Sequence, residues 1–178
     1  MRTVKLRDYA IKLGYDEVLT EDRSGKFSRV TIEANSWKEV AENVRKISGN
    51  TLVFVKPLSS EVLRYSLRNP RVNCIVIERK NSHIFGKKSS LNLIRQYKKP
   101  VEIQLKNLEI DVIYKVISWS KWIEYPFLSS CASKFNELWS PLSKFSLLVS
   151  LGASESEALK WIYISPLRVL SKNDSDTY

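Results

Sequence analysis

Apolar positions along this chain switch repeatedly between the spacing of a strand and that of a helix. Between the strand-like stretches, apolar residues recur every three to four positions, as in Val40, Val44 and Ile47. The strand-like stretches are mostly apolar and β-branched, which is typical of parallel strands covered on both faces. We therefore expect repeated βα units, with strands at residues 16–20, 29–34, 51–55, 74–77, 101–105 and 126–130.

Local signals indicate where the helices begin and end. The first helix is expected to stop at Gly14, and the second to open with the capping box of Ser36 and Glu39. After the last strand the alternation ends, and two further helices are expected, one from Ser140 and one from Ser154 that Pro166 terminates. The remaining helices are predicted at residues 60–67, 91–97 and 108–123.

Consecutive βα units with right-handed crossovers predict an α/β fold built on a parallel sheet. About six units favour a TIM-barrel-like (β/α) barrel, complete or partial, with extra C-terminal helices, and a doubly wound sheet is the alternative. No linker divides the chain, so we expect one domain over residues 1–171 and a flexible tail over 172–178. In either architecture, functional groups gather at the carboxyl ends of the strands.

Positive charge is concentrated in one quarter of the chain. The net charge is +10, and residues 64–106 hold 11 Lys and Arg against two acidic residues. Such a concentration predicts a polyanionic partner, most often a nucleic acid, because each neutralised phosphate releases counterions. An anionic membrane is the other candidate, but it favours a basic amphipathic helix, whereas this segment alternates strand, loop and short helix.

We predict that RNA is bound by the cations of this segment, mostly through backbone phosphates. A loop after the strand at 74–77 is expected to carry several of them. The single histidine is expected to contact RNA or solvent there rather than to act as a general base. The predicted RNA-binding residues are Arg64, Arg68, Arg71, Arg79, Lys80, His83, Lys87, Lys88, Arg95, Lys98 and Lys99.

Motifs of catalytic chemistry are absent from the sequence. With one histidine, a barrel phosphoesterase would lack the several His and Asp ligands that its metals need. The sequence shows no glycine-rich phosphate loop and no nucleophile arrangement. We therefore predict no catalytic residue, no metal site and no cofactor in this chain. The lack of a long apolar run predicts a cytoplasmic protein with no membrane partner.

Three passages resemble a known family, component 3 of archaeal ribonuclease P, related to the thirty-kilodalton protein of the eukaryotic enzyme. "LRNPRVNCIVIERKNSHIFGKKSSLNLIRQYKKPVEIQLKNL" at 67–108 is similar to the family's "NPRVD" motif and the strands that follow it. "FLSSCASKFNELWSPLSKFSLLVSLGAS" at 127–154 and "SESEALKWIYISPLRVL" at 154–170 resemble its closing segments. The positions that match the family motifs are Arg71, Ser130, Ser133 and Pro141.

The resemblance implies a TIM-barrel-like protein subunit of ribonuclease P, the ribonucleoprotein endonuclease that removes 5′ leaders from precursor tRNA. It implies that the RNA subunit carries catalysis and binds Mg²⁺. The implied partners are the ribonuclease P RNA, protein component 2 and other protein subunits, and precursor tRNA in the assembled complex. This chain would bind the RNA and help to fold or position it.

Two departures from the family pattern bear on the fold. The chain begins almost at the first helix, without the strand that usually precedes it, so the barrel is expected to be incomplete there. Cys131 also stands where the family usually has glycine. A further expectation concerns "WSKWIEY" at 119–125, whose aromatic surface suggests a contact with another protein.

Two rival functions remain open from the sequence. One is a metal-dependent barrel phosphoesterase or nuclease that acts without RNA. The other is an RNA-binding subunit of a different ribonucleoprotein, or a nonspecific nucleic-acid binder.

Overall fold

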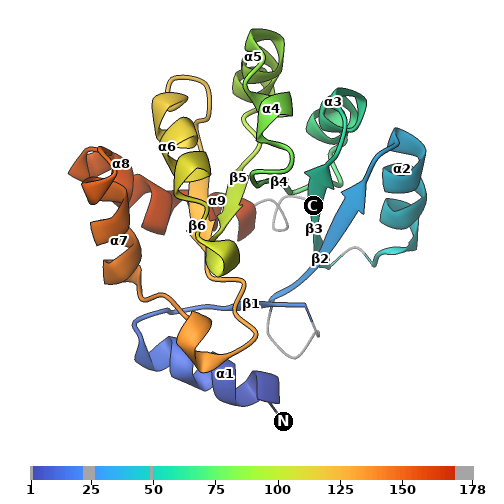
Figure 1. The fold of residues 1–178 in the computed structure, drawn as a ribbon. Coiled ribbons are helices and arrows are strands. Elements are labelled where there is room, and N and C mark those ends of the chain that lie inside the picture. The colour runs from blue at the N-terminus through green and yellow to red at the C-terminus, as the bar shows by residue number, and fades with distance from the viewer. Residues whose placement is uncertain (1, 22–26, 49, 171–178) are drawn as a thin grey trace.

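A single curved sheet of six parallel strands forms the centre of the molecule (Figure 1). The computed structural model describes residues 2–21, 27–48 and 50–170. Each strand pairs with the next one along the chain, which is the order of a barrel and not of a doubly wound sheet. The strands are β1 (Leu19–Thr20), β2 (Phe27–Ala34), β3 (Thr51–Pro57), β4 (Cys74–Ile77), β5 (Val101–Gln104) and β6 (Pro126–Ser129).

Helices surround the convex face of this sheet (Figure 1). The crossover helices are α2 (Trp37–Lys46), α3 (Ser60–Arg68), the short α4 (Ser82–Phe85), α5 (Lys88–Tyr97) and α6 (Ile110–Ser118). Beyond β6 come α7 (Pro141–Ser150), α8 (Glu155–Leu159), η3 (Lys160–Ile164) and α9 (Ser165–Leu170). Two single-turn helices, η1 (Leu105–Asn107) and η2 (Phe135–Glu137), follow β5 and β6. The expected TIM-barrel-like fold with extra C-terminal helices is confirmed.

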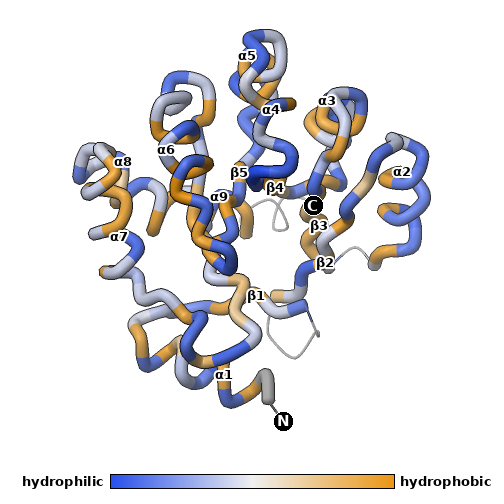
Figure 2. Tube along the Cα trace, viewed as in Figure 1, coloured by the Kyte–Doolittle hydropathy of each residue, from blue (hydrophilic) through white to orange (hydrophobic). Residues whose placement is uncertain are grey.

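The alternation of side chains along each strand separates two apolar layers. In β3, Val53 and Val55 pack outward against the helices, whereas Leu52 and Phe54 belong to a smaller cluster on the concave side. Val169 of α9 packs into that smaller cluster. Figure 2 shows that hydrophobic and hydrophilic residues alternate along the helices, as expected for helices that bury one face against the sheet.

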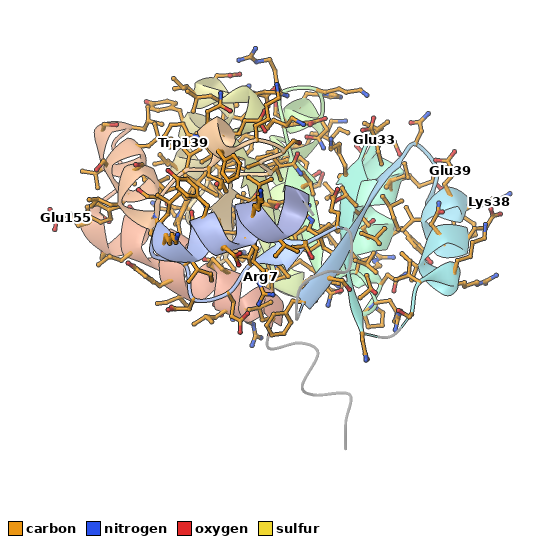
Figure 3. All side chains as sticks on the ribbon, turned by 90° about the horizontal axis from the view of Figure 1, so that it is seen from below. Arg7, Glu33, Lys38, Glu39, Trp139 and Glu155 are labelled. Carbon is orange, nitrogen blue, oxygen red and sulfur yellow. The ribbon has the colours of Figure 1, made fainter. Side chains whose placement is uncertain are left out.

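Helix α1 (Arg2–Lys12) lies across the open side of the curved sheet (Figures 1 and 3). The rings of its Tyr9 and of Phe135 form a T-shaped contact, with the ring centroids 5.4 Å apart. The hydroxyl of Tyr15 donates a hydrogen bond of 2.5 Å to the carbonyl of Trp139, which Figure 3 labels beyond the helix. Within the described residues no strand pairing joins β6 to β1, so the barrel is incomplete at its first strand as expected.

Several element boundaries differ from the predictions. The strand expected at 16–20 is reduced to β1, and the helix expected at 108–123 is shorter because Leu108 takes a positive φ of 41° before α6 begins. The stretch from Arg79 to Lys88 was expected to be a loop, but it contains α4, and α5 begins at Lys88. Apolar burial of Ile84 and Phe85 explains the additional helix.

Pro166 does not end the last helix, contrary to the prediction. The backbone changes to π geometry over η3, where the N–H of Ser165 donates to the carbonyl of Lys160, five residues earlier. A proline in a regular helix clashes with the carbonyl four residues before it, and a π segment relieves such a clash by widening the turn. The helix therefore continues through Pro166 into α9.

At the turn after β6, Cys131 takes a backbone conformation that glycine adopts most easily, although it carries a side chain. Its φ is +46°, in the left-handed region. Both cysteines, Cys74 and Cys131, are free thiols. The tail predicted at 172–178 lies outside the described residues. Among the described residues, no helix is long and apolar enough to cross a bilayer.

Candidate nucleic-acid interface

The predicted RNA-binding residues divide between two ends of the sheet. All strands run parallel, so every loop after a strand lies at one end, here called the carboxyl rim, and every loop before a strand lies at the other, the amino rim. Arg79, Lys80, His83, Lys87 and Lys88 follow β4 and belong to the carboxyl rim. The helix and amino-rim residues are Arg64, Arg68, Arg71, Arg95, Lys98 and Lys99. The structure therefore does not bring the whole set together.

Two cations of the carboxyl rim are neutralised by carboxylates. Arg79 Nη2 lies 2.6 Å from Asp111 Oδ1 of α6, and this hydrogen bond lowers the pKa of Asp111. Lys80 Nζ lies 2.8 Å from Glu33 Oε1 at the end of β2, a residue labelled in Figure 3. The two cations that follow β4 thus find their partners on other units of the fold, on α6 and β2.

A further lysine completes a network at the carboxyl ends of β2, β3 and β4. Lys56 Nζ lies 3.0 Å from Glu78 and 3.6 Å from Glu33. Sequence analysis missed this network, although the alternation of side chains along each strand placed Glu33 and Lys56 on the concave face. Because the network is internally paired, it offers little positive charge to an external ligand.

A buried ion pair lies deeper on the concave face. The guanidinium of Arg29 on β2 donates to both carboxylate oxygens of Glu102 on β5, at 2.5 and 2.9 Å, and lies 3.8 Å over the ring of Phe54. Burial opposes the charge of each partner, but their mutual attraction lowers the pKa of Glu102 and raises that of Arg29. Within the described residues, no three His, Cys, Asp or Glu side chains form a group that could hold a metal ion.

Two predicted RNA-binding cations of the amino rim form hydrogen bonds with backbone carbonyls. Arg71 Nη2 donates to the carbonyl of Ile47 at 3.0 Å, in the loop after α2. One unit further along, buried Lys99 donates to the carbonyls of Asn69, at 2.6 Å, and Val72, in the loop after α3. In two neighbouring βα units, a long cationic side chain before a strand thus binds backbone carbonyls of the preceding amino-rim loop. This contact gives a structural reason for a long cationic side chain at the motif position Arg71.

The rest of the predicted set is exposed. Lys98 forms a surface ion pair with Glu124 at 3.2 Å, and such pairs contribute little to stability. Three of the eleven predicted residues, Arg79, Lys80 and Lys98, form ion pairs, and two more, Arg71 and Lys99, bind backbone carbonyls. Among the described residues, the other six form neither kind of contact: Arg64, Arg68, His83, Lys87, Lys88 and Arg95.

Lys87 and Lys88 stand at an unfavourable position for helix stability. Lys87 is the N-cap of α5 and Lys88 its first residue, with no side-chain cap and no acidic residue in the first turn. A positive charge at a helix N-terminus opposes the helix dipole. Helix stability therefore does not explain these two lysines.

The remaining family-motif positions shape the segment between β6 and α7. The Ser130 hydroxyl accepts a hydrogen bond of 3.1 Å from the N–H of Trp139. The Ser133 N–H donates to Glu137 at 2.6 Å. Pro141 opens α7, directly after the capping residue Ser140. The motif thus maintains a turn structure at the carboxyl rim.

Lys144 is a buried lysine that the charge distribution along the chain did not single out. It lies on α7, and its Nζ donates to the carbonyl of Leu128 at 2.9 Å and lies 4.9 Å from the ring centre of Tyr15. Burial lowers the pKa of Lys144 to about 8.

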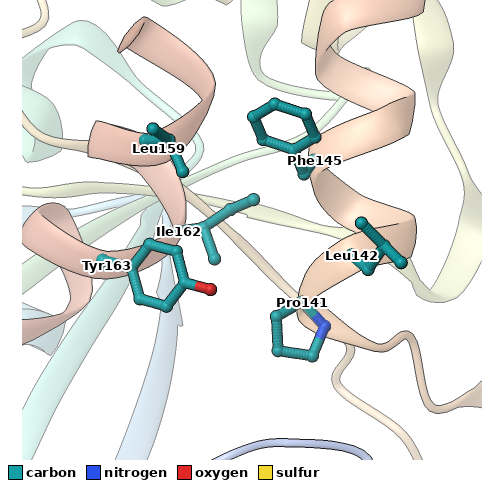
Figure 4. A pocket seen from close by; sticks show the side chains of 6 residues that line it. All are labelled: Pro141, Leu142, Phe145, Leu159, Ile162 and Tyr163. Carbon is teal, nitrogen blue, oxygen red and sulfur yellow. The ribbon is translucent and has the colours of Figure 1, made fainter. Parts of the chain in front are cut away.

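An exposed apolar surface covers the C-terminal helices. A groove of about 220 Å³ between α7 and the α8–η3 segment is lined by apolar side chains that face one another, as Figure 4 shows. Leu142 is 73% exposed, Tyr163 57% and Leu167 62%. By contrast, Trp119 and Trp122 of "WSKWIEY" pack against the core. The lining residues are Pro141, Leu142, Phe145, Leu159, Ile162 and Tyr163.

Comparisons with known proteins agree with the sequence motifs. A curated relative, ribonuclease P protein component 3 of Aeropyrum pernix, is 27% identical to this chain, with 81% of this chain and 73% of the relative covered. This similarity confirms the resemblance that the motifs indicated. No family model matches the chain.

A solved structure shares the fold. A chain in the cryo-EM structure of archaeal ribonuclease P with mature tRNA superposes with a TM-score of 0.80, covering 97% of this chain and 88% of that chain. The two sequences are 14% identical. This likeness concerns the fold.

Proposed function

We propose that this chain is a protein subunit of ribonuclease P, the ribonucleoprotein endonuclease that removes 5′ leaders from precursor tRNA. The observation that carries the proposal is the 27% identity with component 3 of Aeropyrum pernix over most of both chains. The fold and the exposed cations of α3 and α5 agree with it. In this role the chain binds the ribonuclease P RNA and helps to fold or position it.

The proposed division of labour leaves catalysis to the RNA. In this proposal the RNA subunit carries the reaction and binds Mg²⁺, while this chain contributes no catalytic residue and no cofactor site. In this proposal, precursor tRNA binds to the assembled complex, and the complex acts in the cytoplasm. A metal-dependent nuclease activity of the purified chain that survives exhaustive ribonuclease treatment would contradict this division.

The apolar surface of the C-terminal helices is the proposed contact with another protein subunit, component 2. Leu142, Tyr163 and Leu167 are large, apolar and exposed, and burying such side chains is what stabilises a protein interface. Replacing these three residues by glutamate is expected to remove the co-purifying protein subunits. Tyr114→Glu, at an exposed site on α6, is the matched control and should leave them in place.

The first experiment is to purify the protein from its native cells at moderate salt and to sequence the RNA that accompanies it. One abundant structured RNA, with precursor-tRNA cleavage in the same fraction, is the expected result. A different structured RNA would instead indicate another ribonucleoprotein. No enriched RNA would overturn the proposal.

A further inference from the structure

Exposed arginines gather on the outer faces of three neighbouring helices. Arg45 lies on α2, Arg64 and Arg68 on α3, and Arg95 on α5, and all four are exposed. We call these four residues the arginine face. Sequence analysis missed Arg45, because it lies outside the segment in which the excess charge is concentrated.

Fold geometry places these arginines at a similar level. Helices α2 and α3 pack against each other, as do α3 and α5, and all three follow parallel strands. Arg45, Arg68 and Arg95 each occupy the last turn of their helix, and Arg64 lies one turn before Arg68. Packed helices lie roughly 8–10 Å apart, so a row of guanidinium groups follows the outside of the barrel.

No carboxylate neutralises this row within the part of the chain that the structure describes. Glu42 and Glu61 lie three residues before Arg45 and Arg64, yet neither forms an ion pair there. At the carboxyl rim, by contrast, Arg79 and Lys80 are paired with Asp111 and Glu33, so that only part of its positive charge, including Lys87 and Lys88, is left without an ion pair. The two regions therefore differ in the charge that they offer to a ligand.

Helix stability explains only part of this pattern. A cation in the last turn interacts favourably with the helix dipole, which accounts for one charge on each helix. It does not account for Arg64, which lies in the middle of α3. Nor does it require arginine, because lysine carries the same charge, whereas the planar guanidinium forms paired hydrogen bonds with phosphate.

We infer that the arginine face is the principal RNA-contacting surface, and that it binds the phosphate backbone of a structured RNA along the outside of α2, α3 and α5. The inference rests on the proposed function and specifies where the RNA lies. It places the RNA away from the carboxyl rim, where barrel enzymes have their active sites. Contacts of this kind position an RNA without reading its bases.

Two variants with equal net charge test this placement. One replaces Arg45, Arg64, Arg68 and Arg95 by glutamine, which retains good helix propensity. The other removes four carboxyl-rim charges through Lys80→Gln, Lys87→Gln, Lys88→Gln and Lys106→Gln. Binding of the source organism's ribonuclease P RNA, transcribed in vitro, is measured against salt concentration, and urea unfolding checks that both variants fold.

The arginine-face variant is expected to lose at least about tenfold more affinity than the carboxyl-rim variant. Its salt slope should fall by about 3, since each phosphate contact contributes roughly 0.7–0.9 to the slope. Replacing the same four arginines by lysine should keep the slope but weaken binding. Equal losses in the two glutamine variants, or a larger loss in the carboxyl-rim variant, would overturn the placement. Failure of the wild-type protein to bind this RNA would instead overturn the proposed function.

Discussion

Lys144 should make the stability of this protein rise with pH in the alkaline range. Burial lowers its pKa from the ordinary 10.5 to about 8. Between these values the unfolded chain binds a proton that the folded chain has lost, so the free energy of unfolding increases as the pH rises. At about 1.36 kcal/mol for each pH unit, this amounts to roughly 3 kcal/mol in total.

The assay is urea unfolding of the wild type and of Lys144→Met between pH 7 and 10. Methionine retains much of the side-chain volume but cannot titrate, so the difference between the two curves isolates the lysine. We expect the wild type to gain about 2–3 kcal/mol relative to the variant over this range. Tyr15 and Cys131, whose pKa values burial raises to about 12 and 11, remain present in both proteins.

A control variant separates burial from the mere loss of a charge. Lys121→Met removes an exposed lysine from the loop before β6, and its stability curve should run parallel to that of the wild type. Parallel curves for Lys144→Met as well would refute the reasoning, because they would show that Lys144 has the same proton affinity in the folded and unfolded states.

Three further predictions follow from the ion pairs and caps. Glu102→Gln should destabilise the fold by about 3–5 kcal/mol in urea unfolding, because it leaves Arg29 buried without its partner. The double variant Arg29→Met, Glu102→Met should recover most of this loss, and a double variant as unstable as Glu102→Gln would contradict the reasoning. Lys99→Met should lower the free energy of unfolding by about 2–3 kcal/mol, because two buried carbonyls lose their hydrogen-bond donor. The exposed Lys98→Met should lower it by at most about 1 kcal/mol, and equal losses in urea unfolding would show that Lys99 does not hold these loops. Lys87→Asp should raise stability by about 1 kcal/mol by capping α5, and no increase in the urea midpoint would disprove it.

Sequence patterns predicted the repeated βα units and the extra C-terminal helices. The reason is that the spacing of apolar residues along the chain determines whether a strand or a helix can bury them on one face. The capping box at Ser36 and Glu39 formed as predicted, since it needs only neighbouring backbone groups. Pro166 shows the limit of such signals. A π segment accommodates the proline, and the sequence alone does not indicate whether packing will extend a helix beyond such a break.

Charge alone could not show which cations are available to a ligand. The sequence determined that residues 64–106 are strongly basic, but the partners of those cations come from other units of the fold. Asp111, 32 residues away, pairs with Arg79, and Glu33, 47 residues away, pairs with Lys80. Tertiary structure therefore decided which cations are neutralised and which remain exposed, because ion pairing depends on distances in space that charge composition does not contain.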